Sequence, residues 1–450
     1  MKLTDLSPGG GIGANGLLVE TGPFRYVVDS GLHPKYAGNE ALPDLSLVAP
    51  DSLDFILLTH CHLDHLGSLP LLSRKNPNAP ILLSRPTQML ARRMLNNSIA
   101  VMKRQRSEQN LPEYPLYSRP DVAALRERFQ PLKPDQPHLF EKDGQSLDVT
   151  LHHAGHVAGA VSATVRTSEE SAFFTGDLLF TDQRTLDGAK PPLDPVDVLV
   201  TETTRGATPR DPGVSRESEI VRLLQDLRKY LKRGGCVLIP VFALGRMQEM
   251  LVILDEALRK GALPPTPVYC SGLGMDLVNY FHDIALQTPG VRFHRKVLKS
   301  LGVKTPTRAL QPGREPHPGI YLVSSGMVVE NTPSYRLAAS ILHSDRNALL
   351  FVGYCDPDTP GGQLLAARNG SSFLFDALDY RATLRAPIRK YDLSGHADRE
   401  ELLHLAQKLQ PKTIYLHHGD PEARQWFQRE LGQTTDATVL DPAPLQTYET

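Results

Sequence analysis

Three histidines and one aspartate, all able to bind a metal ion, fall within six consecutive residues, in the sequence HCHLDH at positions 60–65. This segment follows residues 54–59, whose apolar pattern predicts a short buried strand. Histidines two positions apart after a strand can point to the same side, so His60 and His62 can share one metal ion. Asp64 and His65 diverge toward a neighbouring position, which suits a second ion. Imidazole and carboxylate ligands suit zinc and, less selectively, manganese or iron.

Two metal ions need more than these ligands, and further candidates follow other predicted strands. His156 lies in the sequence AGHVAG, Asp177 lies in TGD after a predicted strand at 171–174, and His418 lies in HHGD after a predicted strand at 413–416. Each is a weak candidate alone, because a lone histidine is more often hydrogen-bonded than bound to metal. We propose these three residues as ligands because of their order in the chain and the glycines next to them. The alternative is a cluster of core or surface histidines that binds nothing.

Apolar runs and periodicity divide the chain into three stretches. Residues 1–205 alternate predicted strands with helices, which is typical of a layered α/β fold. Residues 206–385 continue as a second α/β stretch, and residues 386–450 return to the style of the first. The predicted strands lie at 24–28, 54–59, 81–83, 171–175, 196–201, 236–240, 268–270, 319–323, 348–352 and 413–416. The predicted helices lie at 87–102, 215–231, 245–258 and 399–409.

Composition argues against several classes of function. The 450 residues carry 49 Lys and Arg against 50 Asp and Glu, which disfavours coating of nucleic acid by bulk charge and leaves a local basic groove open. The longest apolar run, 236–244, is far shorter than a membrane span, and the N-terminus lacks a signal-peptide pattern. Four well-separated cysteines fit a reducing compartment. We therefore expect a cytoplasmic protein with no membrane association.

The candidate ligands, in this order, resemble the motifs of the metallo-β-lactamase superfamily. Asp29 in the sequence DSG, the 60–65 segment, His156 and Asp177 match its first four motifs. The resemblance implies a four-layer αββα fold and a dinuclear metal centre, which Asp29 supports without binding an ion. One ion would be held by His60, His62 and His156, the other by Asp64, His65 and His418, and Asp177 would bridge the two.

Further motifs resemble the β-CASP nucleases, a branch of this superfamily. The sequence TETTRG at 201–206 looks like their acidic motif A, DLSGHAD at 392–398 like motif B, and HGD at 418–420 like motif C. The ligand is assigned to His418 and not to His417, because His418 adjoins Gly-Asp.

This second resemblance covers nearly the whole chain, since FALGRMQE at 242–249 and SSGM at 324–327 also match sequences of the β-CASP domain. It implies a metallo-β-lactamase domain formed by residues 1–205 and 386–450, with an inserted α/β β-CASP domain at 206–385. The family includes the endonuclease of eukaryotic pre-mRNA 3′-end cleavage, bacterial RNase J and short bacterial ribonucleases. This chain is similar to the short kind.

The resemblance implies a metal-dependent nuclease that hydrolyses phosphodiester bonds of single-stranded RNA with two divalent ions, Zn²⁺ or Mn²⁺. Asp64, Glu202 and His396 are the predicted catalytic residues. Glu202 would orient the imidazole of His396, which would donate a proton to the leaving oxygen. The plain alternatives are a carboxylate that caps a strand end and a structural histidine. Single-stranded DNA as substrate, internal or terminal cleavage, and a homo-oligomer stay open.

Two other functions compete with the nuclease. A small-molecule hydrolase of the superfamily, acting on thioesters or lactams, would lack an insertion like the long one between Glu202 and His396. A non-catalytic scaffold would have lost metal ligands, whereas all seven candidates are present here. Two basic stretches, at 284–314 and 92–106, either line a groove for the nucleic acid or form solvated faces.

Overall fold

The computed structural model describes residues 1–306 and 310–450. Its contacts divide the chain into two compact units, each of which is assembled from separate segments. Unit 1 comprises Met1–Asp182, Gly188–Pro209 and His396–Thr450. Unit 2 comprises Gln183–Asp187 and Arg210–Gly395.

Unit 1 contains two seven-stranded sheets. The first has the strand order β21-β1-β2-β3-β4-β5-β6, and the second has the order β20-β19-β11-β10-β9-β8-β7. The strands of the first sheet are β21 (Thr447–Glu449), β1 (Lys2–Asp5), β2 (Leu17–Thr21), β3 (Phe24–Val28), β4 (Phe55–Leu57), β5 (Ile81–Ser84) and β6 (Phe129–Leu132). Those of the second sheet are β20 (Thr438–Leu440), β19 (Thr413–His417), β11 (Val198–Glu202), β10 (Ser171–Phe174), β9 (Val161–Arg166), β8 (Gln145–His153) and β7 (His138–Lys142).

The apolar core of unit 1 lies between its two sheets and takes side chains from both. Tyr26 of β3 stacks on Phe55 of β4 with ring centroids 4.5 Å apart. The edge of the same ring meets Phe174 of β10, with centroids 6.3 Å apart. Offset and edge-to-face aromatic pairs of this kind stabilise a core beyond the area they bury. This packing holds the two sheets face to face.

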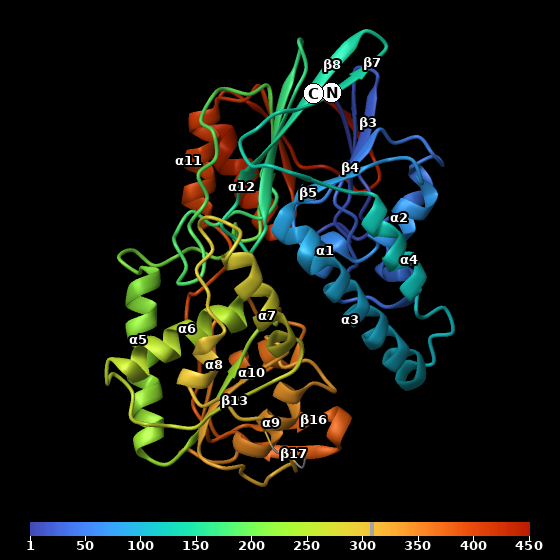
Figure 1. Cartoon of the computed structure of the whole chain (residues 1–450). Coiled ribbons are helices and arrows are strands. Elements are labelled where there is room, and N and C mark those ends of the chain that lie inside the picture. Colours follow the sequence, from blue (N-terminus) through green and yellow to red (C-terminus); the bar gives the residue numbers. More distant parts are fainter. Residues whose placement is uncertain (307–309) are drawn as a thin grey trace. The chain divides into compact units, whose positions relative to one another are not determined.

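Helices cover the outer faces of both sheets in unit 1 (Figure 1). The long helix α3 (Arg85–Gln109) contacts β5 and β6, whereas α11 (Arg399–Leu409) contacts β11 and α12 (Pro421–Thr434) contacts β19 and β20. The remaining helices of the unit are α1 (Leu63–Leu66), α2 (Leu69–Lys75) and α4 (Arg119–Ala124). The order helix, sheet, sheet, helix confirms the predicted four-layer αββα fold.

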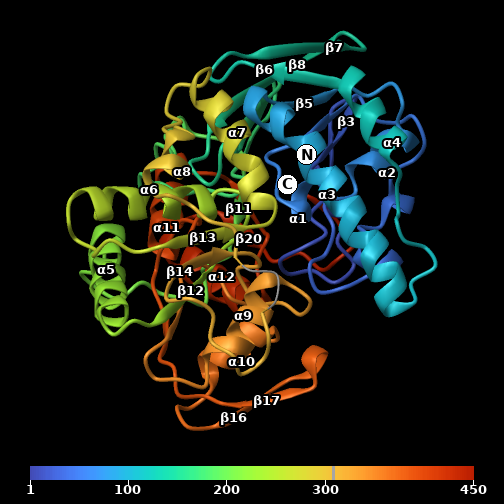
Figure 2. The same cartoon turned by 60° about the horizontal axis from the view of Figure 1, so that its bottom comes forward.

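Unit 2 is built on a five-stranded parallel sheet with the order β13-β14-β12-β15-β18 (Figure 2). All residues of the central strand β12 are buried, as expected of a parallel strand covered on both faces. The strands are β12 (Cys236–Pro240), β13 (Val268–Ser271), β14 (Gly319–Val323), β15 (Ala348–Phe351) and β18 (Ile388–Lys390), and β16 (Ser372–Phe375) pairs with β17 (Tyr380–Thr383) in a hairpin. The helices are α5 (Arg216–Lys232), α6 (Arg246–Arg259), α7 (Leu273–Ala285), α8 (Lys296–Ser300), α9 (Pro333–Ile341) and α10 (Pro360–Ala366).

The bounds of the units differ in three places from the predicted domains 1–205, 206–385 and 386–450. Residues 206–209 belong to unit 1, which continues to Pro209. Residues 386–395 belong to unit 2, because β18 adds to its sheet by pairing with β15. Residues Gln183–Asp187 also belong to unit 2, because Arg292 donates to the carbonyl oxygens of Gln183 and Leu186 at 2.9 and 3.0 Å.

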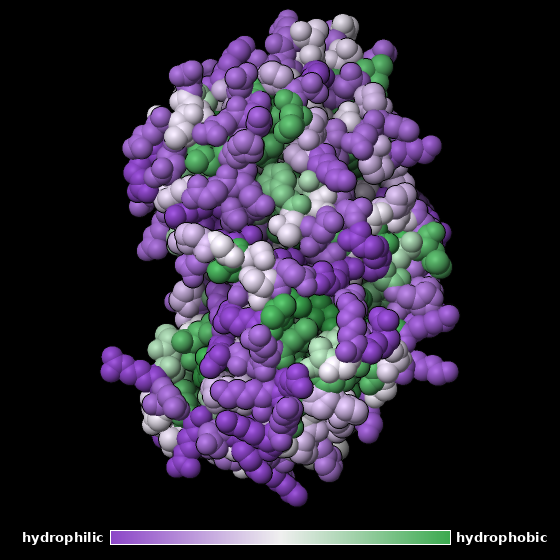
Figure 3. Space-filling view, turned by 90° about the vertical axis from the view of Figure 1, so that its left-hand side faces the viewer, coloured by the Kyte–Doolittle hydropathy of each residue, from purple (hydrophilic) through white to green (hydrophobic). Residues whose placement is uncertain are grey.

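The surface in Figure 3 is mainly hydrophilic, with smaller hydrophobic patches between the polar side chains. Among the described residues, no helix combines the length and the apolar character needed to cross a bilayer.

Candidate metal centre

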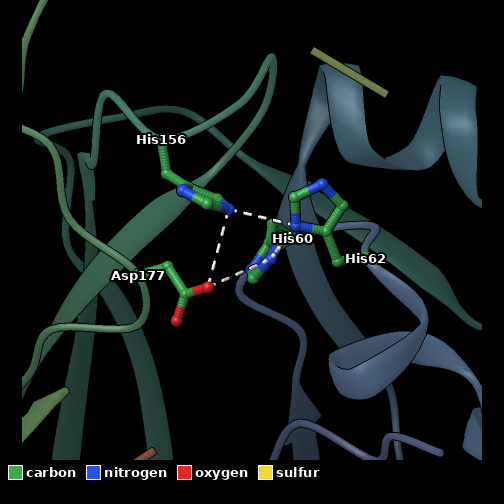
Figure 4. Close-up of side chains that lie close together, drawn as sticks. All are labelled: His60, His62, His156 and Asp177. Carbon is green, nitrogen blue, oxygen red and sulfur yellow. Dashed lines mark hydrogen bonds and ion pairs between the residues drawn. The ribbon is translucent and has the colours of Figure 1, made fainter. Parts of the chain in front are cut away.

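Three histidines of unit 1 direct ring nitrogens at one another (Figure 4). His60 and His62 lie in the loop after β4, and His156 follows β8. Nε2 of His60 lies 3.1 Å from Nδ1 of His62, and Nε2 of His156 lies 3.0 Å from the same Nδ1 atom. The structure therefore brings these predicted ligands together from separate strands.

A second group, also in unit 1, joins Asp64 and His65 of α1 to His418, which follows β19. Nε2 of His65 and Nε2 of His418 lie 3.3 Å apart. Oδ2 of Asp64 is 3.4 Å from the nitrogen of His418 and 3.7 Å from that of His65. Only Leu63 separates His62 of the first group from Asp64 of the second, so one short segment serves both groups.

Asp177, after β10, lies between the two groups. Its Oδ2 atom is 3.6 Å from Nε2 of His60 and 3.5 Å from Nε2 of His156, both in the first group. The same oxygen is 3.5 Å from Nε2 of His65, in the second group. A single carboxylate oxygen thus faces both candidate metal positions, as a bridging ligand must.

Asp29 contacts the ring nitrogen of His65 that lies opposite the candidate metal position. Its Oδ2 atom lies 2.7 Å from Nδ1 of His65, and its carboxylate also accepts the backbone N–H and the hydroxyl of Thr59 at 2.8 and 2.7 Å. An acceptor at Nδ1 places the proton there and leaves the lone pair on Nε2, the atom that faces Asp64 and His418. Asp29 holds this position in a left-handed backbone conformation, with φ 62°.

A threonine plays the equivalent part for His418. Oγ1 of Thr204 lies 2.9 Å from Nδ1 of His418, which frees Nε2 for the centre. His418 itself has a φ of 49°, another left-handed residue at the end of a strand. Neither Thr59 nor Thr204 was among the residues that sequence reasoning selected. Thr59 directly precedes the 60–65 segment and Thr204 lies inside TETTRG at 201–206, but neither pattern indicates a contact with a ligand.

The glycines before His156 and Asp177 have a steric reason. Gly155 has φ 72°, and a Cβ atom there would lie 2.2 Å from the carbonyl oxygen of Leu179. Gly176 has φ 52°, and its Cβ would lie 2.9 Å from the carbonyl oxygen of Val161. Both positions therefore require glycine, which explains why neighbouring glycines marked these two candidate ligands.

The donor atoms fit divalent metal ions. Burial lowers the pKa of His60 well below its usual range and also lowers that of His62, so both imidazoles are neutral and can offer lone pairs. Oδ1 of Asp177 is buried without a hydrogen-bond partner among the described residues. Converging nitrogens and an under-used buried carboxylate are costly unless a cation lies between them. Nitrogen and carboxylate donors in this mixture suit zinc or manganese.

Glu202 and His396 form a pair beside the centre. Oε2 of Glu202 lies 2.9 Å from Nδ1 of His396, and Oε1 accepts the N–H of Leu178 at 2.6 Å. Both oxygens of Glu202 thus have hydrogen-bond partners within the protein, and Glu202 also lies near the ligand atoms of Asp177 and His418. Burial alone would lower the pKa of His396, but the negative charges of Glu202 and Asp177 outweigh it and raise that pKa. Nδ1 of His396 is 3.9 Å from Oδ2 of Asp177.

His417 belongs to neither ligand group. Its Nδ1 atom lies 3.7 Å from Oδ2 of Asp5. This placement agrees with the choice of His418 as the candidate ligand.

The basic stretches lie away from these groups in the sequence. In the first, Arg292 pairs with Asp187, so this side chain has a structural role. Arg295 and Lys296 are exposed at the start of α8, and Arg308 lies outside the described residues. In the second stretch, Arg92, Lys103, Arg104 and Arg106 are exposed on α3.

Three family models match successive parts of the chain. Residues 9–230 match the metallo-beta-lactamase superfamily, residues 247–364 the Beta-Casp domain, and residues 381–440 the Zn-dependent metallo-hydrolase RNA specificity domain. The chain belongs to the β-CASP family of the metallo-β-lactamase superfamily. This confirms the resemblance found in the sequence, and it makes the chain a metal-dependent hydrolase.

Relatives with established names align with most of the chain at low identity. Integrator complex subunit 11 of Danio rerio is 26% identical over 98% of this chain and 73% of its own length. Endoribonuclease ysh1 of Schizosaccharomyces pombe is 28% identical over 93% of this chain, which spans 54% of that protein. Cleavage and polyadenylation specificity factor 73 of Drosophila melanogaster is 27% identical, and the chain spans 60% of it.

A solved structure has the same fold over the full length. A protein of unknown function from Enterococcus faecalis V583 aligns with a TM-score of 0.56 and 13% identity, covering 99% of both chains. At this identity the likeness concerns the fold alone.

Proposed function

We propose that this β-CASP hydrolase is a nuclease that cleaves phosphodiester bonds of single-stranded RNA with two divalent metal ions. The observation that carries the proposal is the position of Asp177, whose Oδ2 atom lies 3.5–3.6 Å from histidine nitrogens of both ligand groups. Beside that carboxylate lies the Glu202–His396 pair, which supplies a proton donor.

The residues divide into those that hold ions and those that act on the substrate. His60, His62 and His156 would hold one ion, Asp64, His65 and His418 the other, and Asp177 both. When bound, two such ions lower the pKa of a shared water and neutralise charge on the phosphate. Asp29 and Thr204 keep His65 and His418 in the tautomer that presents Nε2 to the centre.

The proposed reaction balances with one water molecule and one proton donor. The water oxygen forms a bond to phosphorus, and the bond from phosphorus to the 3′ oxygen breaks. The departing 3′ oxygen takes a proton from His396. The phosphate remains on the 5′ oxygen of the downstream fragment. Glu202 accepts the Nδ1–H of His396, so Nε2 is the atom that donates.

Two comparisons support RNA as the substrate. The model matched by residues 381–440 is named for RNA specificity, and two relatives are named as an endoribonuclease and as a cleavage and polyadenylation factor. The catalytic groups do not themselves require a 2′-hydroxyl, so preference for RNA over DNA would come from contacts to that group elsewhere.

The four cysteines support a reducing compartment, because all of them are free and buried. We therefore also propose that the protein is cytoplasmic. We propose zinc, in preference to manganese, as its metal.

The test uses purified protein supplied with Zn²⁺ or Mn²⁺ and unstructured RNA labelled at the 5′ or the 3′ end. DNA of the same sequence, a thioester and a lactam are tested in parallel. We expect RNA fragments with 5′-phosphate and 3′-hydroxyl ends, and the two labels distinguish internal from terminal cleavage. Hydrolysis of the thioester or the lactam with intact RNA would instead establish a small-molecule hydrolase. Asp177→Asn provides the inactive control.

A further inference from the structure

The loop that carries His396 is fixed on its downstream side by backbone contacts. The N–H of Ala397, the next residue, donates to the carbonyl oxygen of Leu178 at 2.5 Å. Asp398 then begins α11, where its side chain accepts the N–H of Glu401 at 3.1 Å. These bonds leave the upstream side of the loop to be held by other groups.

Arg216 holds the upstream side. Its Nη1 atom donates to the carbonyl oxygen of Ser394 at 2.8 Å, and Ser394 lies two residues before His396. Arg216 is the first residue of α5, far from Ser394 in the sequence, and only 5% of its surface is exposed. A buried guanidinium bound to a loop carbonyl restrains that carbonyl more tightly than a solvated side chain would.

Glu249 locks the guanidinium in place. Its Oε1 atom lies 3.1 Å from Nε and 2.7 Å from Nη2 of Arg216, and Oε2 lies 2.5 Å from the same Nη2. The carboxylate is fully buried and also pairs with Arg246. Because the guanidinium is planar, a fork bound along one edge fixes the direction in which Nη1 points.

We propose that Arg216 is a positioning residue for the general acid, acting on His396 through the carbonyl of Ser394. The inference rests on the proposed function, since it needs His396 to donate a proton in phosphodiester hydrolysis. The contacts from Glu249 to Arg216 and from Arg216 to Ser394 fix the position at which the backbone enters the loop. Two residues after Ser394, the imidazole of His396 contacts Glu202. A shift of the backbone at Ser394 would move Nε2 of His396 away from the leaving oxygen. Proton transfer is sensitive to the distance between these two atoms.

The alternative is a buried ion pair that only stabilises unit 2. The two roles differ in which substrates suffer when Arg216 is replaced. Loss of acid positioning slows only reactions whose leaving group needs a proton, whereas loss of structure slows every reaction. Bis(p-nitrophenyl) phosphate supplies the contrast, because p-nitrophenolate departs without a proton.

The test measures kcat of the metal-loaded full chain on unstructured RNA and on bis(p-nitrophenyl) phosphate. Arg216→Lys keeps the charge beside Glu249 but cannot bond Glu249 with two nitrogens and reach Ser394 as well. Arg216→Met removes both bonds. Arg259→Met is the matched control, because Arg259 is 63% exposed and pairs with Asp255 on the surface of α6.

We expect both Arg216 variants to lower kcat on RNA by about 10- to 100-fold and on the activated diester by less than about 2-fold, with unchanged metal content. In a His396→Ala background, Arg216→Lys should lower kcat on RNA by less than about 2-fold, because the group it positions is gone. The control variant should behave as the wild type does.

Equal losses on the two substrates would overturn the inference, and so would an undiminished effect of Arg216→Lys in the His396→Ala background. Melting temperatures show whether a variant fails to fold. If Arg216→Met does not fold, Arg216→Lys, which keeps the buried charge, distinguishes a positioning role from a structural one. A wild type inactive on RNA and on the activated diester would refute the proposed function itself, and the role of Arg216 with it. The two failures are therefore distinct, since the first needs an active wild type.

Discussion

Asp29 and His65 are 36 positions apart in the sequence, yet Oδ2 of Asp29 lies 2.7 Å from Nδ1 of His65. The carboxylate is held in turn by the N–H and the hydroxyl of Thr59. These contacts hold the ring of a candidate ligand through Nδ1, the nitrogen opposite the Nε2 atom that faces His418. The orientation of His65 should therefore depend on the charge of Asp29.

Replacing Asp29 by Asn should weaken metal binding without removing a ligand. Asparagine tolerates the left-handed backbone at this position, but its amide cannot accept hydrogen bonds at both terminal atoms. Loss of such a supporting partner typically costs about 10- to 100-fold in metal affinity. The measurement is competition with a chelator of known affinity. Asp135→Asn is the control, because Asp135 lies 2.7 Å from Nδ1 of His152 away from the centre, and it should leave affinity unchanged.

Asp177→Asn should abolish hydrolysis and release at least one ion, because Asp177 faces both ligand groups. His62→Ala should do the same through the loss of Nδ1, on which two other histidines converge. Metal content per chain by elemental analysis and the rate on RNA provide the two readings. His417→Leu removes the neighbouring histidine and should retain both ions; loss of metal in that variant would move the ligand from His418 to His417.

His396→Ala should lower kcat on RNA by about 10²- to 10⁴-fold, the usual contribution of a general acid, and leave metal content unchanged. Glu202→Gln keeps an acceptor for the N–H of Leu178 but loses the charge beside His396. Because Glu202 acts through the imidazole, the double variant should be little slower than His396→Ala alone. Losses that multiply would mean that Glu202 does not serve His396.

Unstructured RNA should be cleaved faster than a blunt duplex of the same length. The proposed proton donor is recessed: the side chain of His396 is 16% exposed, and that of Glu202, which would orient it, is 1% exposed. A single strand can bend toward such groups, whereas a duplex is stiff. Rates should also fall as salt screens the phosphates. Initial rates on both forms at equal ionic strength test this, and equal rates would refute it.

Two elements with a strong local pattern were well predicted from sequence. The predicted strand 236–240 matches β12, and the predicted helix 399–409 matches α11. A continuous apolar run indicates a strand buried on both faces, and a capped segment with helical periodicity indicates a helix with one buried face. Both patterns can be recognised from neighbouring residues alone. The helix predicted at 87–102 is longer in the structure, since α3 runs from Arg85 to Gln109.

Several antiparallel strands were missed, both the mostly buried β2 and β9 and the partly exposed β7 and β8. Strands β7 and β8 are joined by Asp143-Gly144, whose φ angles of 49° and 73° suit a tight two-residue hairpin turn. The signal was present as Asp-Gly between alternating side chains, but short alternation is weaker than a continuous apolar run. The resemblance-based domain bounds missed the pairing of β18 with β15, because sequence does not show which strands are neighbours.

The residues that meet in the candidate site were selected from local sequence motifs, whereas the contacts that support them were not predicted. Each selected residue stands in a local motif after a strand, and the structure brings these residues together in unit 1. Thr204 contacts His418 across 214 positions, because β11 pairs with β19. That contact depends on strand order. The roles of the selected residues as metal ligands and as acid stay predictions.

The most direct test of the central claim is a metal titration of the metal-free protein, with bound ions per chain and RNA cleavage followed together. We expect cleavage to appear as the second ion binds and to be abolished by exhaustive chelation. Cleavage by protein from which all metal has been removed, or full activity with a single ion per chain, would refute the proposed two-metal reaction.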